Sequence, residues 1–144
     1  MAKILLVEDD PDTRELVRLT LELYGHDVIE AKAAEDGVAE ARASAPDLIL
    51  MDLSLGGKFD GLEATKRLRA DPAFDATPIV ALTAHAMAGD REKSLAAGCD
   101  EHWTKPILDL SSFKDNVARI AAQGRTVHAE RESGPLNPDR PPSA

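Results

Sequence analysis

Five side chains that can do chemistry follow four short apolar runs of the sequence. The runs are Ile4–Val7, Leu48–Met51, Ile79–Leu82 and a weaker segment through Trp103. The side chains that follow them are Glu8, Asp9, Asp52, Thr83 and Lys105. Apolar runs of this length predict strands buried on both faces of a parallel sheet, and ligands bind outside the carboxyl ends of such strands. We therefore expect carboxylates, a hydroxyl and an ammonium to meet in one crevice.

The carboxylates of this set predict a site for a divalent cation and for phosphoryl chemistry. Neighbouring like charges raise one another's pKa unless a cation lies between them, and oxygen ligands in a small hydrated site favour Mg²⁺, with Mn²⁺ as the substitute. Beside such a cation the carboxylate of Asp52 can attack phosphorus and form an aspartyl phosphate. The Lys105 ammonium and the Thr83 hydroxyl can then contact the phosphoryl oxygens. Each residue alone is commonplace, so the interpretation depends on their joint placement.

The segments that position these residues alternate between strand-like and helix-like patterns. This alternation predicts an α/β fold, a doubly wound, five-stranded parallel sheet with five helices. The first helix is expected to start with Asp10 as N-cap and Pro11 in the first position, and to stop at Gly25. Two apolar rows recur along it at helical spacing, namely Leu16, Leu19 and Leu23, and Val17, Leu21 and Tyr24. The other helices are expected over residues 35–44, 61–70, 88–97 and 110–120, with a short strand over residues 27–30.

Composition limits the classes of function. The chain has 144 residues, which suits one domain, and its aromatic content of 3% requires a core of aliphatic side chains. A net charge of -9 repels phosphate backbones, so we expect no binding to nucleic acid. The sequence has no apolar run of membrane-spanning length and no signal peptide, and its lone cysteine, Cys99, cannot form an internal disulfide. These features predict a cytoplasmic protein that does not contact a membrane.

The domain is expected to occupy residues 1–123. Residues 124–144 contain prolines and no apolar periodicity, which predicts a disordered tail or the stub of a linker. The initial Met1 favours a complete chain over an excised fragment.

The chain resembles the receiver domains of two-component response regulators, the family of the chemotaxis switch protein. The matching segments are KILLVEDD (3–10), DLILMDLSL (47–55), FDGLE (59–63), PIVALTAHA (78–86) and AGCDEHWTKP (97–106). They cover essentially all of residues 2–122. The resemblance implies that Asp52 is the phosphoacceptor, that Asp9 binds Mg²⁺ directly and that Glu8 acts through water. It also implies that the backbone carbonyl of Ser54 is a metal ligand and that this position tunes the reaction.

The same resemblance assigns roles nearer the end of the chain. Thr83 is implied as the switch hydroxyl, Lys105 as the contact to the phosphoryl group, and Pro106 as a cis-proline. His102 occupies a position that is generally aromatic and swings inward in this family, so it is a candidate switch residue with a titratable ring. His85 lies at a position that tunes the lifetime of the phosphate.

One loop departs from the family pattern. Gly56 stands where the family usually has proline, and one residue more precedes the pair Asp60-Gly61. This predicts a more flexible loop after Asp52 and a wider mouth of the site.

The function implied is a phosphorylation-driven signalling switch. A sensor histidine kinase or a histidine phosphotransfer protein is expected to phosphorylate Asp52, and residues 88–122 are expected to contact a downstream protein. The chain is then no enzyme beyond its own phosphorylation and dephosphorylation, and it is either a monomer or a dimer that forms on phosphorylation.

Other interpretations stay open at this point. The chain can be a phosphorelay intermediate, or a receiver excised from a hybrid kinase. A Mg²⁺-dependent phosphohydrolase with an aspartyl-phosphate intermediate is less favoured, because such enzymes usually have a second acid where this sequence has Ser54. A flavin- or nucleotide-binding module is disfavoured by the lack of a glycine-rich phosphate loop.

Overall fold

The computed structural model describes residues 2–55, 57–83, 89–104 and 110–123. The strands are β1 (Lys3–Val7), β2 (Asp27–Ala31), β3 (Leu48–Asp52), β4 (Ile79–Thr83) and β5 (Glu101–Thr104). The helices are α1 (Pro11–Leu23), α2 (Ala34–Ser44), α3 (Gly61–Arg69), α4 (Asp90–Ala97) and α5 (Leu110–Gln123), with a short 3-10 helix η1 (Pro72–Phe74). The predicted alternation of strands and helices is thereby confirmed, whereas η1 was not predicted. The expected tail, residues 124–144, lies outside the described residues.

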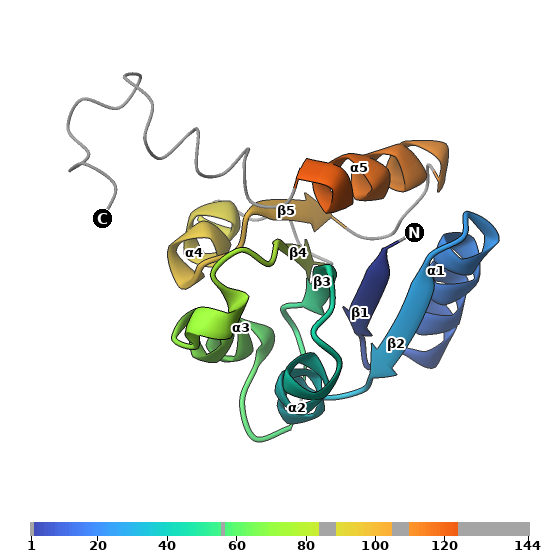
Figure 1. Ribbon diagram of the computed structural model, residues 1–144. Coiled ribbons are helices and arrows are strands. Elements are labelled where there is room, and N and C mark those ends of the chain that lie inside the picture. The colour runs from blue at the N-terminus through green and yellow to red at the C-terminus, as the bar shows by residue number, and fades with distance from the viewer. Residues whose placement is uncertain (1, 56, 84–88, 105–109, 124–144) are drawn as a thin grey trace.

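The strands form one parallel sheet in the order β2-β1-β3-β4-β5, with helices on both faces (Figure 1). Because all the strands are parallel, their carboxyl ends lie at the same edge of the sheet. From β1 the chain first adds β2 on one side and then β3 on the other side. Ligands bind at this switch point between β1 and β3 in open sheets of this kind. This is the doubly wound fold that the sequence predicts.

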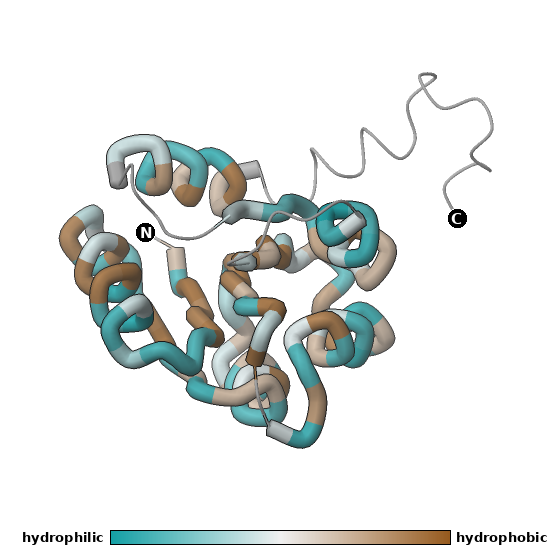
Figure 2. The backbone as a smooth tube through the Cα atoms, turned by 180° about the vertical axis from the view of Figure 1, so that it is seen from behind, coloured by the Kyte–Doolittle hydropathy of each residue, from teal (hydrophilic) through white to brown (hydrophobic). Residues whose placement is uncertain are grey.

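Two apolar clusters cover the two faces of the sheet. Alternate residues of the strands pack against α2 and α3 on one face and against α1 and α5 on the other. Phe74 and Phe113 are the buried aromatics of the described residues, and aliphatic side chains supply the rest of the core. Figure 2 shows apolar stretches along the central strands, whereas apolar and hydrophilic segments alternate along the helices.

Helix α1 starts as the sequence predicts, but of its two apolar rows only Val17 and Leu21 are buried. The Asp10 carboxylate accepts a hydrogen bond from the Thr13 backbone N–H at 3.0 Å, and Pro11 occupies the first turn. Val17 and Leu21 are buried. The exposed large apolar residues of this region are Leu16, Leu19, Leu23 and Tyr24, with exposures of 45%, 51%, 77% and 45%. Helix α1 therefore presents an apolar stripe to solvent.

A buried ion pair joins α3 to the strands that follow it. Arg69 Nη2 lies 2.8 Å from Asp100 Oδ2, and these side chains are 12% and 2% exposed. Asp100 also accepts from the Ile79 backbone N–H at 2.8 Å. The guanidinium donates further to the carbonyls of Gly98 and Phe74. These bonds hold the start of β4 and the approach to β5 against the end of α3.

The lone cysteine is buried within the fold. Cys99 is fully buried, and its Sγ lies 3.8 Å from Thr65 Oγ1. Burial raises the pKa of this thiol to about 11. None of the helices in the described ranges combines the length and apolar character that a membrane span needs.

Candidate metal and phosphoacceptor site

Three carboxylates converge at the carboxyl edge of β1 and β3. One oxygen each from Glu8, Asp9 and Asp52 lies within 4.8 Å of the others. Glu8 and Asp9 follow β1 directly, and Asp52 is the last residue of the neighbouring strand β3. Glu8 and Asp52 are 0% and 1% exposed, while Asp9 is open to solvent. The cluster is thus built from two buried carboxylates and one at the surface.

This donor set fits a small hard cation. All three groups offer oxygen, two of them are withdrawn from water, and their like charges repel at this separation. A divalent cation between them offsets that repulsion, and an exposed third ligand leaves room for the waters that Mg²⁺ retains. The residues present therefore fit Mg²⁺ or Mn²⁺.

The carboxylate of Asp52 is oriented by the residue two positions later. The backbone N–H and the hydroxyl of Ser54 both donate to Asp52 Oδ1, each at 3.0 Å. The first residue of α3 also approaches closely: a Cβ added at Gly61 would overlap the Asp52 carbonyl oxygen. Two hydrogen bonds thus orient the side chain of the phosphoacceptor candidate, and its backbone lies directly against the start of α3.

A hydrogen bond from the loop after Asp52 joins this loop to α2. The Lys58 backbone N–H donates to the Glu35 carboxylate at 3.1 Å, and Gly57 has a φ of 108° that favours glycine. Gly56 lies outside the described residues, so the predicted flexibility of this loop stays a prediction.

Thr83 lies at the same edge of the sheet as the carboxylates. It ends β4, and its predecessor Leu82 is paired with Asp52 of β3. Thr83 is 7% exposed. Three further candidates, His85, Lys105 and Pro106, lie outside the described residues, and their predicted roles stay predictions.

His102 lies apart from the acidic cluster, beside α4. It is paired with Ala81 in the sheet, and its Nδ1 lies 3.0 Å from the hydroxyl of Ser94, which is fully buried. Burial lowers the pKa of the His102 imidazole below its ordinary value. The ring therefore contacts helix α4 in this structure.

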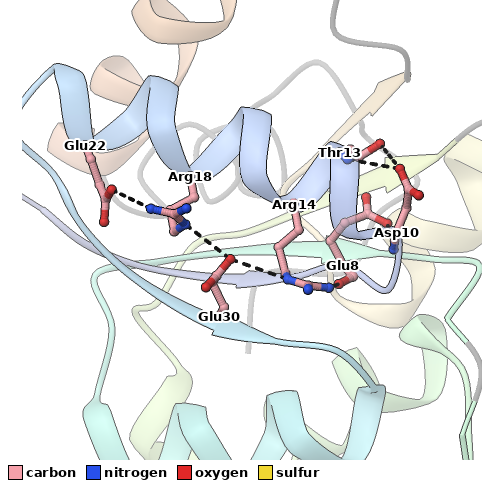
Figure 3. A network of polar contacts seen from close by, with 7 residues as sticks. All are labelled: Glu8, Asp10, Thr13, Arg14, Arg18, Glu22 and Glu30. Atoms are coloured by element: carbon pink, nitrogen blue, oxygen red, sulfur yellow. Dashed lines mark hydrogen bonds and ion pairs between the residues drawn. The ribbon is translucent and has the colours of Figure 1, made fainter.

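A polar network on α1 was not predicted from the sequence, and it reaches the acidic cluster. Arg14 Nη1 donates to the Glu8 carbonyl at 3.0 Å, and Arg14 Nε lies 3.4 Å from Glu30 of β2 (Figure 3). Glu30 also pairs with Arg18, which pairs with Glu22. One feature of the sequence could have indicated this network: Arg14 lies in the first turns of the helix that follows the acidic pair.

Comparison with known proteins identifies the class that this fold and site define. The response regulator receiver domain family matches residues 4–118, and the chain belongs to this family. It is a signalling receiver domain, and this family binds Mg²⁺ at an acidic pocket.

Two relatives are similar to this chain over most of their length. Protein PilH of Pseudomonas aeruginosa is 36% identical over 121 residues, which cover 84% of this chain and 99% of PilH. The polar-differentiation response regulator DivK of Brucella ovis is 38% identical over 104 residues, or 72% of this chain and 84% of DivK.

Solved structures share the fold. The receiver domain of a sensor histidine kinase from P. aeruginosa, which has a magnesium ion coordinated in its active-site cleft, is 34% identical with a TM-score of 0.73, covering 87% of this chain and 98% of that one. The chemotaxis protein CheY4 of Vibrio cholerae is 26% identical with a TM-score of 0.76, covering 83% of this chain and 98% of that one.

Proposed function

We propose that this receiver domain is switched by phosphorylation of Asp52, and that the phosphoryl donor is a phosphohistidine on a sensor kinase or phosphotransfer protein. The observation that carries the proposal is the placement of a buried Asp52 carboxylate within 4.8 Å of Glu8 and Asp9. An isolated buried carboxylate would be costly, whereas one beside a bound cation is stable and oriented for attack.

In the transfer step, an oxygen of Asp52 forms a bond to phosphorus while the nitrogen–phosphorus bond of the donor breaks. The bonding electron pair returns to the donor imidazole, which takes up a proton from solvent. Ser54 holds Oδ1 through two hydrogen bonds, so the carboxylate enters the reaction with its rotation already restricted. Glu8, Asp9, Asp52 and the carbonyl of Ser54 would hold Mg²⁺, which supplies positive charge to the phosphoryl oxygens.

The response is proposed to travel along β4 and β5. The hydroxyl of Thr83 moves toward the phosphoryl group, and Lys105 provides a second contact. Since β4 is hydrogen-bonded to β5, a shift at Thr83 reaches His102 and the surface formed by α4, β5 and α5. We propose that a downstream protein binds this surface, and that two copies of the chain associate through it if phosphorylation causes dimerisation.

The exposed stripe of α1 is the proposed contact for the phosphoryl donor. Leu16 and Leu19 are half exposed on the helix that begins two residues after Asp9. Exposed large apolar residues of this kind mark protein contacts. Because α1 follows the acidic pair directly in the chain, its exposed leucines suit a partner that presents its phosphohistidine beside an apolar surface.

A phosphohydrolase is the competing function, and the contacts of Ser54 weigh against it. Ser54 donates two hydrogen bonds to Asp52, whereas turnover of small phosphoesters needs a general acid at that position. A phosphorelay shuttle and a fragment of a hybrid kinase both use the proposed chemistry. Transfer of label from Asp52 onward to a histidine phosphotransfer protein distinguishes the shuttle from a terminal regulator. The cytoplasmic location stays a prediction.

The phosphoacceptor is tested with acetyl phosphate and Mg²⁺. We expect the wild type to gain one hydroxylamine-labile phosphoryl group and Asp52→Asn to gain none, as measured by intact-protein mass spectrometry. Asp36→Asn, a change at an exposed acid on α2, is the matched control and should label normally. Labelling of Asp52→Asn to the wild-type extent would refute the assignment.

Lys105 is tested separately from phosphorylation. We expect Lys105→Ala to bind Mg²⁺ like the wild type but to lose the change in partner binding that phosphorylation causes. Binding of the downstream partner is measured by titration calorimetry with and without phosphoryl donor. Partner binding that still responds to phosphorylation would remove Lys105 from the mechanism.

A further inference from the structure

Two adjacent residues contribute carboxylates to one cluster, which ordinary strand geometry does not allow. Successive side chains of a strand point to opposite faces, so Glu8 and Asp9 would diverge if β1 continued through them. The strand ends at Val7, yet the Glu8 backbone N–H still donates to the Ala31 carbonyl of β2 at 3.0 Å. The chain must therefore turn at the peptide between Glu8 and Asp9.

That peptide is held by a side chain of α1. Arg14 Nη1 donates to the Glu8 carbonyl at 3.0 Å, while the Glu8 carboxylate accepts from the Asp10 backbone N–H at 3.1 Å (Figure 3). The Glu8 residue is thus bound at its N–H, its carbonyl and its carboxylate. The Arg14 side chain is only 13% exposed, so water competes weakly for its hydrogen bond.

The guanidinium of Arg14 is itself fixed from the other side. Its Nε lies 3.4 Å from Glu30 on β2, and Glu30 is shared with Arg18 at the same distance. An arginine suits this position because its planar group can bond a carboxylate and a carbonyl at the same time. The Arg14–Glu30 pair therefore links β2, α1 and the turn after β1.

Charge and geometry make opposite predictions for Arg14. A positive charge beside three carboxylates repels a cation, so on charge alone its removal should tighten metal binding. If the hydrogen bond to the Glu8 carbonyl instead keeps the two carboxylates converged, its removal should weaken metal binding. Glu30 offsets much of the charge, which favours the second effect.

We propose that Arg14 is a positioning residue of the metal site, and that it acts by holding the Glu8–Asp9 peptide in the turn that aims both carboxylates at Asp52. The inference rests on the proposed function, because it assumes that the three carboxylates bind a divalent cation. It adds a residue that is not itself a metal ligand but whose loss is expected to lower the affinity for the metal.

The test measures Mn²⁺ binding by electron paramagnetic resonance and Mg²⁺ binding by calorimetry on unphosphorylated protein. We expect Arg14→Met to raise the Kd for either ion by about tenfold or more, the range typical for partners that orient metal ligands. Arg14→Lys keeps the charge but cannot form both contacts, so its Kd should rise as well. With acetyl phosphate, the labelling rate of both variants should recover at saturating Mg²⁺.

Arg18→Met is the matched control, because Arg18 shares Glu30 but does not contact Glu8. Its Kd should stay within about twofold of the wild type, since it orients no ligand. Circular dichroism and urea unfolding without metal show whether each variant folds. If Arg14→Met does not fold, the Kd of Arg14→Lys decides the test. An Arg14 variant that folds and binds the ions as tightly as the wild type, or more tightly, overturns the inference. A wild type that binds neither ion overturns the proposed function instead.

Discussion

The imidazole of His102 lies 3.0 Å from the hydroxyl of Ser94, and this contact joins β5 to α4. The Ser94 hydroxyl also donates to the Arg91 carbonyl at 2.9 Å. A hydroxyl has one hydrogen, so both bonds form together only when His102 Nδ1 carries the proton and Ser94 accepts it. The contact lies between β5 and α4, two of the elements whose surface we propose as the output of the switch.

The stability of the protein should depend on the titration of His102. Burial lowers the pKa of His102 in the folded state below 6.5, although Asp90 and Glu92 of α4 oppose this effect and Arg91 adds to it. The unfolded chain therefore binds protons that the folded chain does not, between the folded pKa and 6.5. The stabilisation is fully present above pH 6.5 and is lost as the pH falls through the folded pKa.

This dependence is measured by urea unfolding of the wild type and of His102→Asn, whose amide can still donate to Ser94. We expect the variant to lose less stability than the wild type on acidification below pH 6.5. His26, whose pKa is also lowered by burial and by the N-terminus, provides a second contribution, so His26→Asn is measured in parallel. Equal acid sensitivity of the wild type and His102→Asn would contradict the assignment.

Breaking the Arg69–Asp100 pair should be costly. Arg69→Met leaves Asp100, which is 2% exposed, without its guanidinium partner, and we expect a loss of about 3–5 kcal/mol in the free energy of unfolding. Arg42→Met is the control, because the Arg42–Asp71 pair is 55% and 30% exposed and should contribute less than about 1 kcal/mol. Chemical denaturation measures both, and similar losses for the two variants would show that burial does not decide the cost.

A change on the exposed face of α1 should separate two kinds of phosphoryl donor. Leu19→Asn is expected to slow phosphotransfer from a cognate phosphohistidine protein about tenfold, the loss typical of a central apolar contact. Labelling by acetyl phosphate should be unchanged, because a small donor needs no helix contact. The free energy of unfolding should change by less than about 0.5 kcal/mol, since Leu19 is 51% exposed. Normal transfer from the protein donor would place its contact elsewhere.

The strands and the acidic residues at their ends could be predicted because each depends on a local pattern. Fully buried parallel strands such as β3 read as continuous apolar runs, and Asp52 follows from where that run ends. The inward row of α1 could not be chosen, because Leu16 and Leu19 are as apolar as Val17 and Leu21. Only the packing against β1 and α5 distinguishes them.

The missed residues act through partners that sequence does not place beside them. Arg14 contacts the carbonyl of Glu8, and Ser94 contacts a ring on another element. Gly61 was predicted only as the start of a helix. Its lack of a side chain is required because the backbone of Asp52 approaches it directly. Such close approaches leave no periodic signal in the chain.

The position of β5 bears on how a signal leaves the molecule. β3 is enclosed between two strands and buried along its whole length, whereas β5 pairs on one side only and has no buried residue among its four. We therefore expect β5 to yield more easily than β3, the strand that carries Asp52. A change at Asp52, on the enclosed strand β3, is then expected to cause its larger displacement at β5. An event confined to a few atoms near Asp52 can thus alter the shape of a distant face while the proposed metal ligands stay in place.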